Sequence, residues 1–299
     1  MKKFGPDFYD LTDLLTDEEL LIQQTAFDFV KAEFMPVISK NYENGTFPME
    51  LIPKLGELGF MGSSLPEESG GAGVSNVAYG LILHELERGD SGLRSFASVQ
   101  GSLVMYPIHA YGSDHQKAKW LPGLGAGNLI GCFGLTEPNF GSNPGGMTTR
   151  CKRDGDDWII NGQKVWTSGA HYSDFGILVV RHDPDVAKHK GLTFFFVDMK
   201  SPGITVKPIK QITGQAGSGS GFNEVYFDDV RIPDSQRLGE IGDGWKVAIT
   251  TLMNERLAVG DARGSDIEEA LILSKTKDDA GETLIKNDSV RERLADCLG

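Results

Sequence analysis

Cysteine is scarce in this sequence. Its 299 residues include only Cys132, Cys151 and Cys297. An odd number of cysteines cannot pair completely, and their spacing matches no zinc-ligand pattern. The six histidines are scattered and have no acidic or thiol partner at ligand spacing. The sequence therefore predicts neither a disulfide framework nor a metal site, and it favours a reducing, cytoplasmic compartment.

Positive charge and long apolar runs are also rare. Lysine and arginine total 29 residues against 42 aspartates and glutamates, which gives a formal net charge of −13. A charge of this sign disfavours binding to nucleic acid or to anionic membrane surfaces. No apolar run approaches the roughly 20 residues of a membrane-spanning helix, and the first residues lack the apolar segment of a secretion signal. Neither a nucleic-acid partner nor a membrane span is expected.

Helical signals dominate the first part of the chain. Thr16 and Ser113 each begin a capping box, with an acidic or amide residue three positions later. Ser75 is placed to cap a third helix, whose apolar residues recur at helical spacing. The length exceeds that of one typical domain, so several domains are expected.

The character of the sequence changes near residue 129. Asn161-Gly162, between two alternating runs, predicts a hairpin turn, and further apolar runs that follow are typical of strands. Helical spacing returns after Gly244, but a helical domain usually needs about four helices and 267–299 provides barely two. The chain is predicted to be an α+β multidomain protein with an N-terminal helical domain (1–128), a middle β domain of barrel or sandwich type (129–240), and a partial, truncated C-terminal helical bundle (241–299).

Two short motifs are candidates for ligand binding. "CFGLTEPNFGSN" (132–143) forms a loop whose backbone N–H groups and hydroxyls, on Thr136 and Ser142, could bind a flavin edge or a pyrophosphate. "KVWTSGA" (164–170) places Trp166 where it could cover a planar ring, while Ser168 donates to the ring. The residues alone favour an ordinary strand and turn for the first motif and a core tryptophan for the second.

These motifs, together with "GLTFFFVD" and "FNEVYFDDVRIP" in this order and spacing, resemble the acyl-CoA dehydrogenase family. The resemblance covers about Thr16 to Arg263. It implies an FAD-dependent enzyme that oxidises acyl-CoA thioesters between the α and β carbons, with electron-transfer flavoprotein as acceptor and a homo-oligomeric assembly. The FAD contacts that it implies are Phe133, Leu135, Thr136, Ser142, Trp166, Thr167 and Ser168.

The segment "HELERGDSGLRSFASVQ" (84–100) is similar to the glutaryl-CoA dehydrogenase branch of the family. That resemblance implies that Arg94 binds a distal carboxylate of the substrate, with Glu87 and Ser95 beside it and Ser142 nearby. A guanidinium suits this role because it offers paired hydrogen bonds to a planar carboxylate. A surface arginine paired with Glu87 or Asp90 is the alternative. The later motifs look like broader family members, so a related short acyl-CoA is the alternative substrate.

The stretch "TTLMNERLAVG" (250–260) contains the candidate catalytic base. Family members of the isovaleryl-CoA dehydrogenase type place the base on the first bundle helix, just before an arginine, and Glu255-Arg256 matches that position. The resemblance implies that Glu255 removes the α-proton and that Arg256 serves the CoA side or the helix packing. The alternative is an ion-paired helix carboxylate, with the base in an absent segment. Two other functions stay open: a truncated, non-catalytic chain that binds flavin or pairs with another subunit, and a flavin monooxygenase.

Overall fold

The computed structural model describes residues 10–212, 221–258 and 267–298. Helices make up the first part of the chain and return after the strands. No helix within these ranges is long and apolar enough to cross a membrane. The α-helices and the short 3₁₀ or π segments (η) are, in chain order, η1 (Leu11–Leu14), α1 (Asp17–Phe29), η2 (Val30–Phe34), α2 (Met35–Asn44), η3 (Met49–Leu51), α3 (Ile52–Glu57), η4 (Glu67–Ser69), α4 (Asn76–Gly89), α5 (Ser91–Ser98), η5 (Val99–Met105), α6 (Tyr106–Tyr111), α7 (Asp114–Gly125), η6 (Pro144–Gly146), η7 (Asp234–Gln236), α8 (Gly244–Ala258), α9 (Ile267–Ser274), η8 (Leu284–Lys286) and α10 (Asp288–Leu298).

The predicted helix starts are confirmed. The Thr16 hydroxyl accepts a hydrogen bond from the Glu19 amide at 3.2 Å, and the Glu19 carboxylate accepts one from the Thr16 amide at 3.0 Å. The same reciprocal pair begins α7 at Ser113, and the Ser75 hydroxyl caps α4. Each cap satisfies a backbone donor that the first helical turn leaves unpaired.

The strands form a layer against the helices. In the described part of the chain, eight strands join in the order β6-β7-β3-β2-β4-β5-β8, and β1 pairs with β4. Almost every residue of β4 and β5 is buried, which explains their continuous apolar runs. The α+β fold predicted from the sequence is confirmed. The strands are β1 (Gly131–Gly134), β2 (Arg150–Asp154), β3 (Asp157–Lys164), β4 (Phe175–Arg181), β5 (Leu192–Asp198), β6 (Ile204–Pro208), β7 (Asn223–Pro233) and β8 (Arg237–Leu238).

The predicted hairpin at Asn161-Gly162 is wrong. β3 runs through both residues, and the β2–β3 turn lies earlier, between the paired residues Asp154 and Asp157. Gly162 has φ of 146°, and a Cβ there would lie 2.6 Å from the Thr149 Cα. Glycine is thus required by a close backbone approach, where the β3–β7 register also shifts. The Asn161-Gly162 pair therefore lies at an irregularity within a strand and not in a turn.

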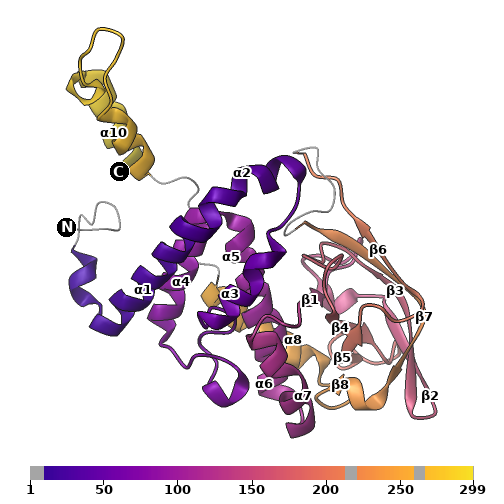
Figure 1. Ribbon diagram of the computed structural model, residues 1–299. Helices are drawn as coiled ribbons and strands as arrows, with labels where there is room; N and C mark the ends of the chain where they lie inside the picture. Colours follow the sequence, from indigo (N-terminus) through magenta and orange to yellow (C-terminus); the bar gives the residue numbers. More distant parts are fainter. Residues whose placement is uncertain (1–9, 213–220, 259–266, 299) are drawn as a thin grey trace.

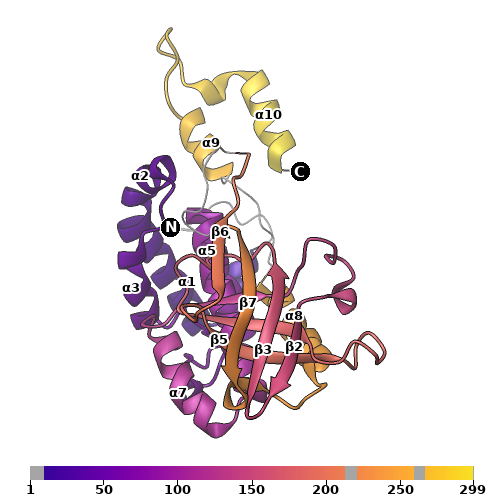
Figure 2. The same cartoon turned by 90° about the vertical axis from the view of Figure 1, so that its right-hand side faces the viewer.

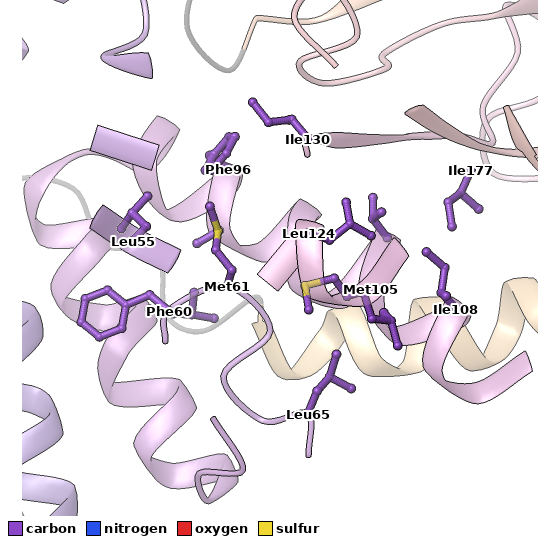
Figure 3. Packing of buried hydrophobic residues seen from close by; sticks show 14 of the residues in the cluster. Leu55, Phe60, Met61, Leu65, Phe96, Met105, Ile108, Leu124, Ile130 and Ile177 are labelled. Carbon is purple, nitrogen blue, oxygen red and sulfur yellow. The ribbon is translucent and has the colours of Figure 1, made fainter. Parts of the chain in front are cut away.

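One apolar core continues from the helices into the strands. Figure 3 shows Met105, Ile108 and Leu124 of the helices, with Ile177 of β4 near them. The buried Gln100 strengthens this junction, because its amide donates to Leu124 O and Leu129 O and accepts from the amide of Gly131, at 2.8–3.0 Å. The helical part and the strand layer are therefore held together where β1 begins.

Helix α8 lies at the junction of the helical part and the strand layer (Figure 1), where it packs against η5 and α6 on one side and β5 on the other. Its residues Val247, Ala248 and Thr251 are almost completely buried. The Tyr111 hydroxyl also bonds that of Thr250 at 2.6 Å. These contacts fix which face of α8 points inward. By contrast, α9 and α10 stand apart from both layers (Figure 2).

Candidate active site

A cavity of about 260 Å³ lies where the helical part, the strands and α8 meet. Side chains from four segments that are distant in sequence line it: the α5–η5 helix, the end of β1, the residues after β3, and α8. Eight of the lining residues were predicted from the sequence as site residues: Arg94, Ser95, Phe133, Leu135, Thr136, Trp166, Ser168 and Glu255. The other lining residues are Ser98, Val99, Leu103, Val165 and Leu252.

The continuous helix formed by α5 and η5 supplies one wall. Ser95, Val99 and Leu103 follow each other at intervals of four residues, so they share one helix face. Arg94 and Ser98, which are also four residues apart, lie next to this face. η5 is a π-helical segment, a form that is rare in helices and is often found at functional sites. This wall combines one cation and two hydroxyls with aliphatic groups.

A second wall comes from the ends of two strands. Phe133 is in β1, and Leu135 and Thr136 follow it directly into the cavity lining. After β3, Val165, Trp166 and Ser168 reach the same space. The Val165 amide donates to Thr136 O at 2.9 Å, which holds the two segments side by side.

Trp166 has an unusual backbone. Its φ is 61°, in the left-handed region that residues other than glycine rarely adopt. Its side chain is 55% exposed, and its ring meets that of Phe222 edge-on with 5.6 Å between centroids. Such strain persists only where the surroundings impose it, and it is concentrated at functional sites. An exposed indole held beside a cavity in this way is suited to cover a planar ligand.

Helix α8 provides the carboxylate. Leu252 and Glu255 are three residues apart and share the face that lines the cavity. Burial raises the pKa of the half-buried Glu255 above its usual value, while the positive charges of Arg256 and Arg94 act in the opposite direction. A carboxylate with a raised pKa at a cavity wall is suited to accept a proton from a weak carbon acid.

A second carboxylate, that of Glu87, forms an ion pair with Arg94 from outside the cavity lining. The Arg94 Nε donates to Glu87 Oε2 at 2.8 Å, and both side chains are largely buried. Asp90, the other partner considered for Arg94, instead caps α5 through the amides of Gly92 and Leu93. In the described ranges no other carboxylate forms an ion pair with Arg94. Its Nη1 lies 3.5 Å from the Ser98 hydroxyl, and the other N–H groups can donate to a ligand in the cavity.

Four predicted residues lie elsewhere. Glu87 stands behind Arg94, and Ser142 is exposed on its loop. Thr167 is almost fully buried and lines a separate apolar space of about 10 Å³. Arg256 is exposed and directs a guanidinium N–H toward the Met253 sulfur at 3.9 Å. Their direct contact with cofactor or substrate stays a prediction.

Sequence reasoning missed the lining residues that have no distinctive chemistry. Ser98, Val99 and Leu103 could have been found from helical spacing, since they lie one and two turns beyond Arg94 and Ser95. Leu252 lies one turn before Glu255 and could have been found in the same way. Val165 is an ordinary apolar strand residue, and no signal in the sequence distinguishes it.

The lining residues fit the ring system of a flavin. Trp166, Phe133 and Leu135 offer apolar and aromatic surface, and Thr136 and Ser168 offer hydroxyl donors on the same cavity. A planar heteroaromatic ring with one polar edge requires this combination of surfaces. The exposure of the Trp166 indole is also explained if a planar ring covers it.

Comparison with known proteins gives a consistent result along the chain. Family models of the acyl-CoA dehydrogenase N-terminal, middle and C-terminal domains match residues 16–128, 132–230 and 242–299. The short-chain specific acyl-CoA dehydrogenase of Rattus norvegicus mitochondria is 32% identical over 94% of this chain and 69% of that protein.

Solved structures agree. A glutaryl-CoA dehydrogenase from Mycobacterium smegmatis in complex with FADH2 superposes with a TM-score of 0.84 at 35% identity, covering 96% of this chain and 73% of that one. Butyryl-CoA dehydrogenase from Megasphaera elsdenii gives 0.82 at 30% identity, covering 94% and 75%. The matched domains, the identity and the shared fold show that this chain belongs to the acyl-CoA dehydrogenase family of FAD-dependent enzymes.

Proposed function

We propose that this chain oxidises a short acyl-CoA thioester between its α and β carbons, with Glu255 as the catalytic base. The observation that carries the proposal is the meeting of Glu255 and Arg94 with Trp166, Thr136 and Ser168 around one cavity. A base and a surface for a flavin ring are the parts that this reaction requires, and Arg94 adds an anion-binding group for the acyl chain.

The chain's own residues would divide the work as follows. Trp166, Phe133 and Leu135 hold the ring of FAD, and Thr136 and Ser168 donate hydrogen bonds to its polar edge. When bound, FAD supplies the chemistry of accepting a hydride from the substrate β-carbon. Glu255 takes the α-proton, and its partial desolvation makes the carboxylate a stronger base than it would be in water.

For the acyl group we favour a short chain with a distal carboxylate, of the glutaryl type. Arg94 supports this choice, because Glu87 fixes the guanidinium while leaving its other donors available at the cavity wall. A butyryl-type chain without a carboxylate would leave those donors without an anionic partner, at a cost in binding. The assembly that we propose is a cytoplasmic homo-oligomer that passes electrons to electron-transfer flavoprotein.

The test is anaerobic mixing of the FAD-loaded protein with acyl-CoA while the visible flavin absorbance is recorded. Wild-type protein should lose this absorbance. Glu255→Gln keeps the volume but cannot accept the proton, so the rate should fall about 10²–10⁴-fold. Glu57→Gln is the matched control, because Glu57 is an exposed carboxylate of α3 that does not line the cavity.

Three outcomes separate the possibilities. Equal loss of absorbance in wild type and Glu255→Gln would show that Glu255 is only a helix charge. No loss in either protein would favour a non-catalytic, flavin-binding or subunit-pairing chain. If anaerobic NADH and not acyl-CoA removes the absorbance, and oxygen admitted afterwards restores it, the result would favour a flavin monooxygenase.

A further inference from the structure

Beneath the cavity lies a buried ion pair that the proposed reaction does not use. Lys164 is completely buried at the end of β3, and Glu137 is 3% exposed just after the segment that lines the cavity. The Lys164 ammonium lies 2.9 Å from Glu137 Oε1. Removing two charges from water is costly before their attraction is counted, so such a pair needs an explanation beyond stability.

Glu137 closes the loop that begins after β1. One carboxylate oxygen accepts from the amide and hydroxyl of Thr148, at 2.6 and 2.9 Å. The other accepts from the amide of Thr149 at 2.8 Å. The side chain therefore joins the start of the loop to its end. Residues between them, including Ser142, are held as one closed unit.

Lys164 fastens the same loop to β3. Besides Glu137, its ammonium donates to Leu135 O at 2.9 Å, and it approaches the Met147 sulfur at 3.6 Å. One residue further along, the Val165 amide donates to Thr136 O. Lys164 thus contacts the backbone of Leu135, which lines the cavity. Lys164 itself lies two residues before Trp166, another lining residue.

The surroundings keep both partners charged near neutrality. For Glu137, burial alone would raise the pKa, but the Lys164 ammonium and the Thr148 and Thr149 donors lower it to about 2. For Lys164, burial lowers the pKa to about 8, against the opposing effect of Glu137. The ionised carboxylate offers acceptor sites on both oxygens for its three hydrogen bonds from the loop.

We propose that the Glu137–Lys164 pair is a positioning device for the FAD site. It holds the Leu135-Thr136 segment beside the Val165-Trp166 segment, so that both keep their places in the lining of the flavin cavity. Neither residue lines the cavity, so both act through the segments that they hold. This inference rests on the proposed function, in which FAD occupies that cavity.

The test compares FAD affinity with stability in the full chain. FAD is removed, and the apoprotein is titrated with FAD while quenching of flavin fluorescence gives the Kd. Lys164→Met should raise the Kd at least about tenfold. The double variant Glu137→Gln and Lys164→Met leaves no unpaired charge. It should unfold close to the wild-type temperature and still show the weakened FAD binding, with an altered visible circular dichroism of the bound flavin.

Arg231→Met is the matched control. It removes an exposed β7 arginine that pairs with Asp154 and Asp157 away from the cavity, and the Kd for FAD should not change. If Lys164→Met fails to fold, the double variant still decides the question. A double variant that binds FAD with the wild-type Kd and spectrum overturns the proposal. Failure of the dehydrogenase proposal would look different, since wild-type flavin would then not be reduced by acyl-CoA.

Discussion

Arg94 and Glu255 line the same cavity, one from the helical part and the other from α8. Burial raises the pKa of the Glu255 carboxyl, and the Arg94 guanidinium acts to lower it. Glu87 holds Arg94 from behind at 2.8 Å. A substrate carboxylate that binds Arg94 would offset part of its positive charge. The basicity of Glu255 is therefore linked to what Arg94 binds.

This relationship predicts a shift in pH dependence. Because the base must be ionised, kcat/KM should fall on the acid side as pH drops through the pKa of Glu255. Arg94→Met removes a cation that favours the ionised form, so that pKa should rise and the acid limb should move to higher pH. Arg94→Lys keeps the charge and should leave the limb close to its wild-type position. If the acid limbs of the kcat/KM profiles coincide for wild type and Arg94→Met, Arg94 does not affect the pKa of Glu255.

Substrate preference separates the two roles of Arg94. Glutaryl-CoA should give a higher kcat/KM than butyryl-CoA with the wild-type protein, because a guanidinium can bind the distal carboxylate through two hydrogen bonds. Arg94→Met should abolish the preference, a loss of about 2–5 kcal/mol for a buried charge pair that loses one partner. Arg94→Lys should retain part of it. Wild-type preference for butyryl-CoA would show that Arg94 does not bind the acyl group.

Trp166 gives a prediction for cofactor binding. Trp166→Ala removes the aromatic surface next to the cavity and should raise the Kd for FAD about tenfold or more. Because the side chain is 55% exposed, the melting temperature of the apoprotein should change little. Trp166→Phe should bind FAD with intermediate affinity. Unchanged affinity in a folded Trp166→Ala variant would place the flavin ring elsewhere.

The helix starts and the order of elements were predictable because capping boxes and apolar spacing are local signals. Thr16, Ser75 and Ser113 cap the helices that their neighbours predict. The cavity was predictable only where a residue has distinctive chemistry or matches a family motif, as Arg94 and Glu255 do. The Glu137–Lys164 contact depends on how β3 lies beside the loop, which no local pattern encodes. The same limit explains the error at Asn161-Gly162.

That error leads to a last prediction, about stability. Gly162→Ala should destabilise the protein, since φ of 146° is strained for alanine and the new Cβ would lie 2.6 Å from the Thr149 Cα. The strain alone costs about 1–3 kcal/mol, and the backbone clash adds to it. Gly155→Ala is the matched control, because Gly155 also has a positive φ, of 63°, but nothing lies within 4 Å of its added Cβ.

Urea unfolding of both variants should therefore give a larger loss of free energy for Gly162→Ala than for Gly155→Ala. Thr149 also donates its amide to Glu137, so the displacement should extend into the loop that we propose to position FAD and should weaken FAD binding in Gly162→Ala alone. Equal losses of stability would mean that positive φ, not the close approach to Thr149, is the reason for glycine in this strand. A stability loss without weaker FAD binding would show that the strand can shift while the loop keeps its place.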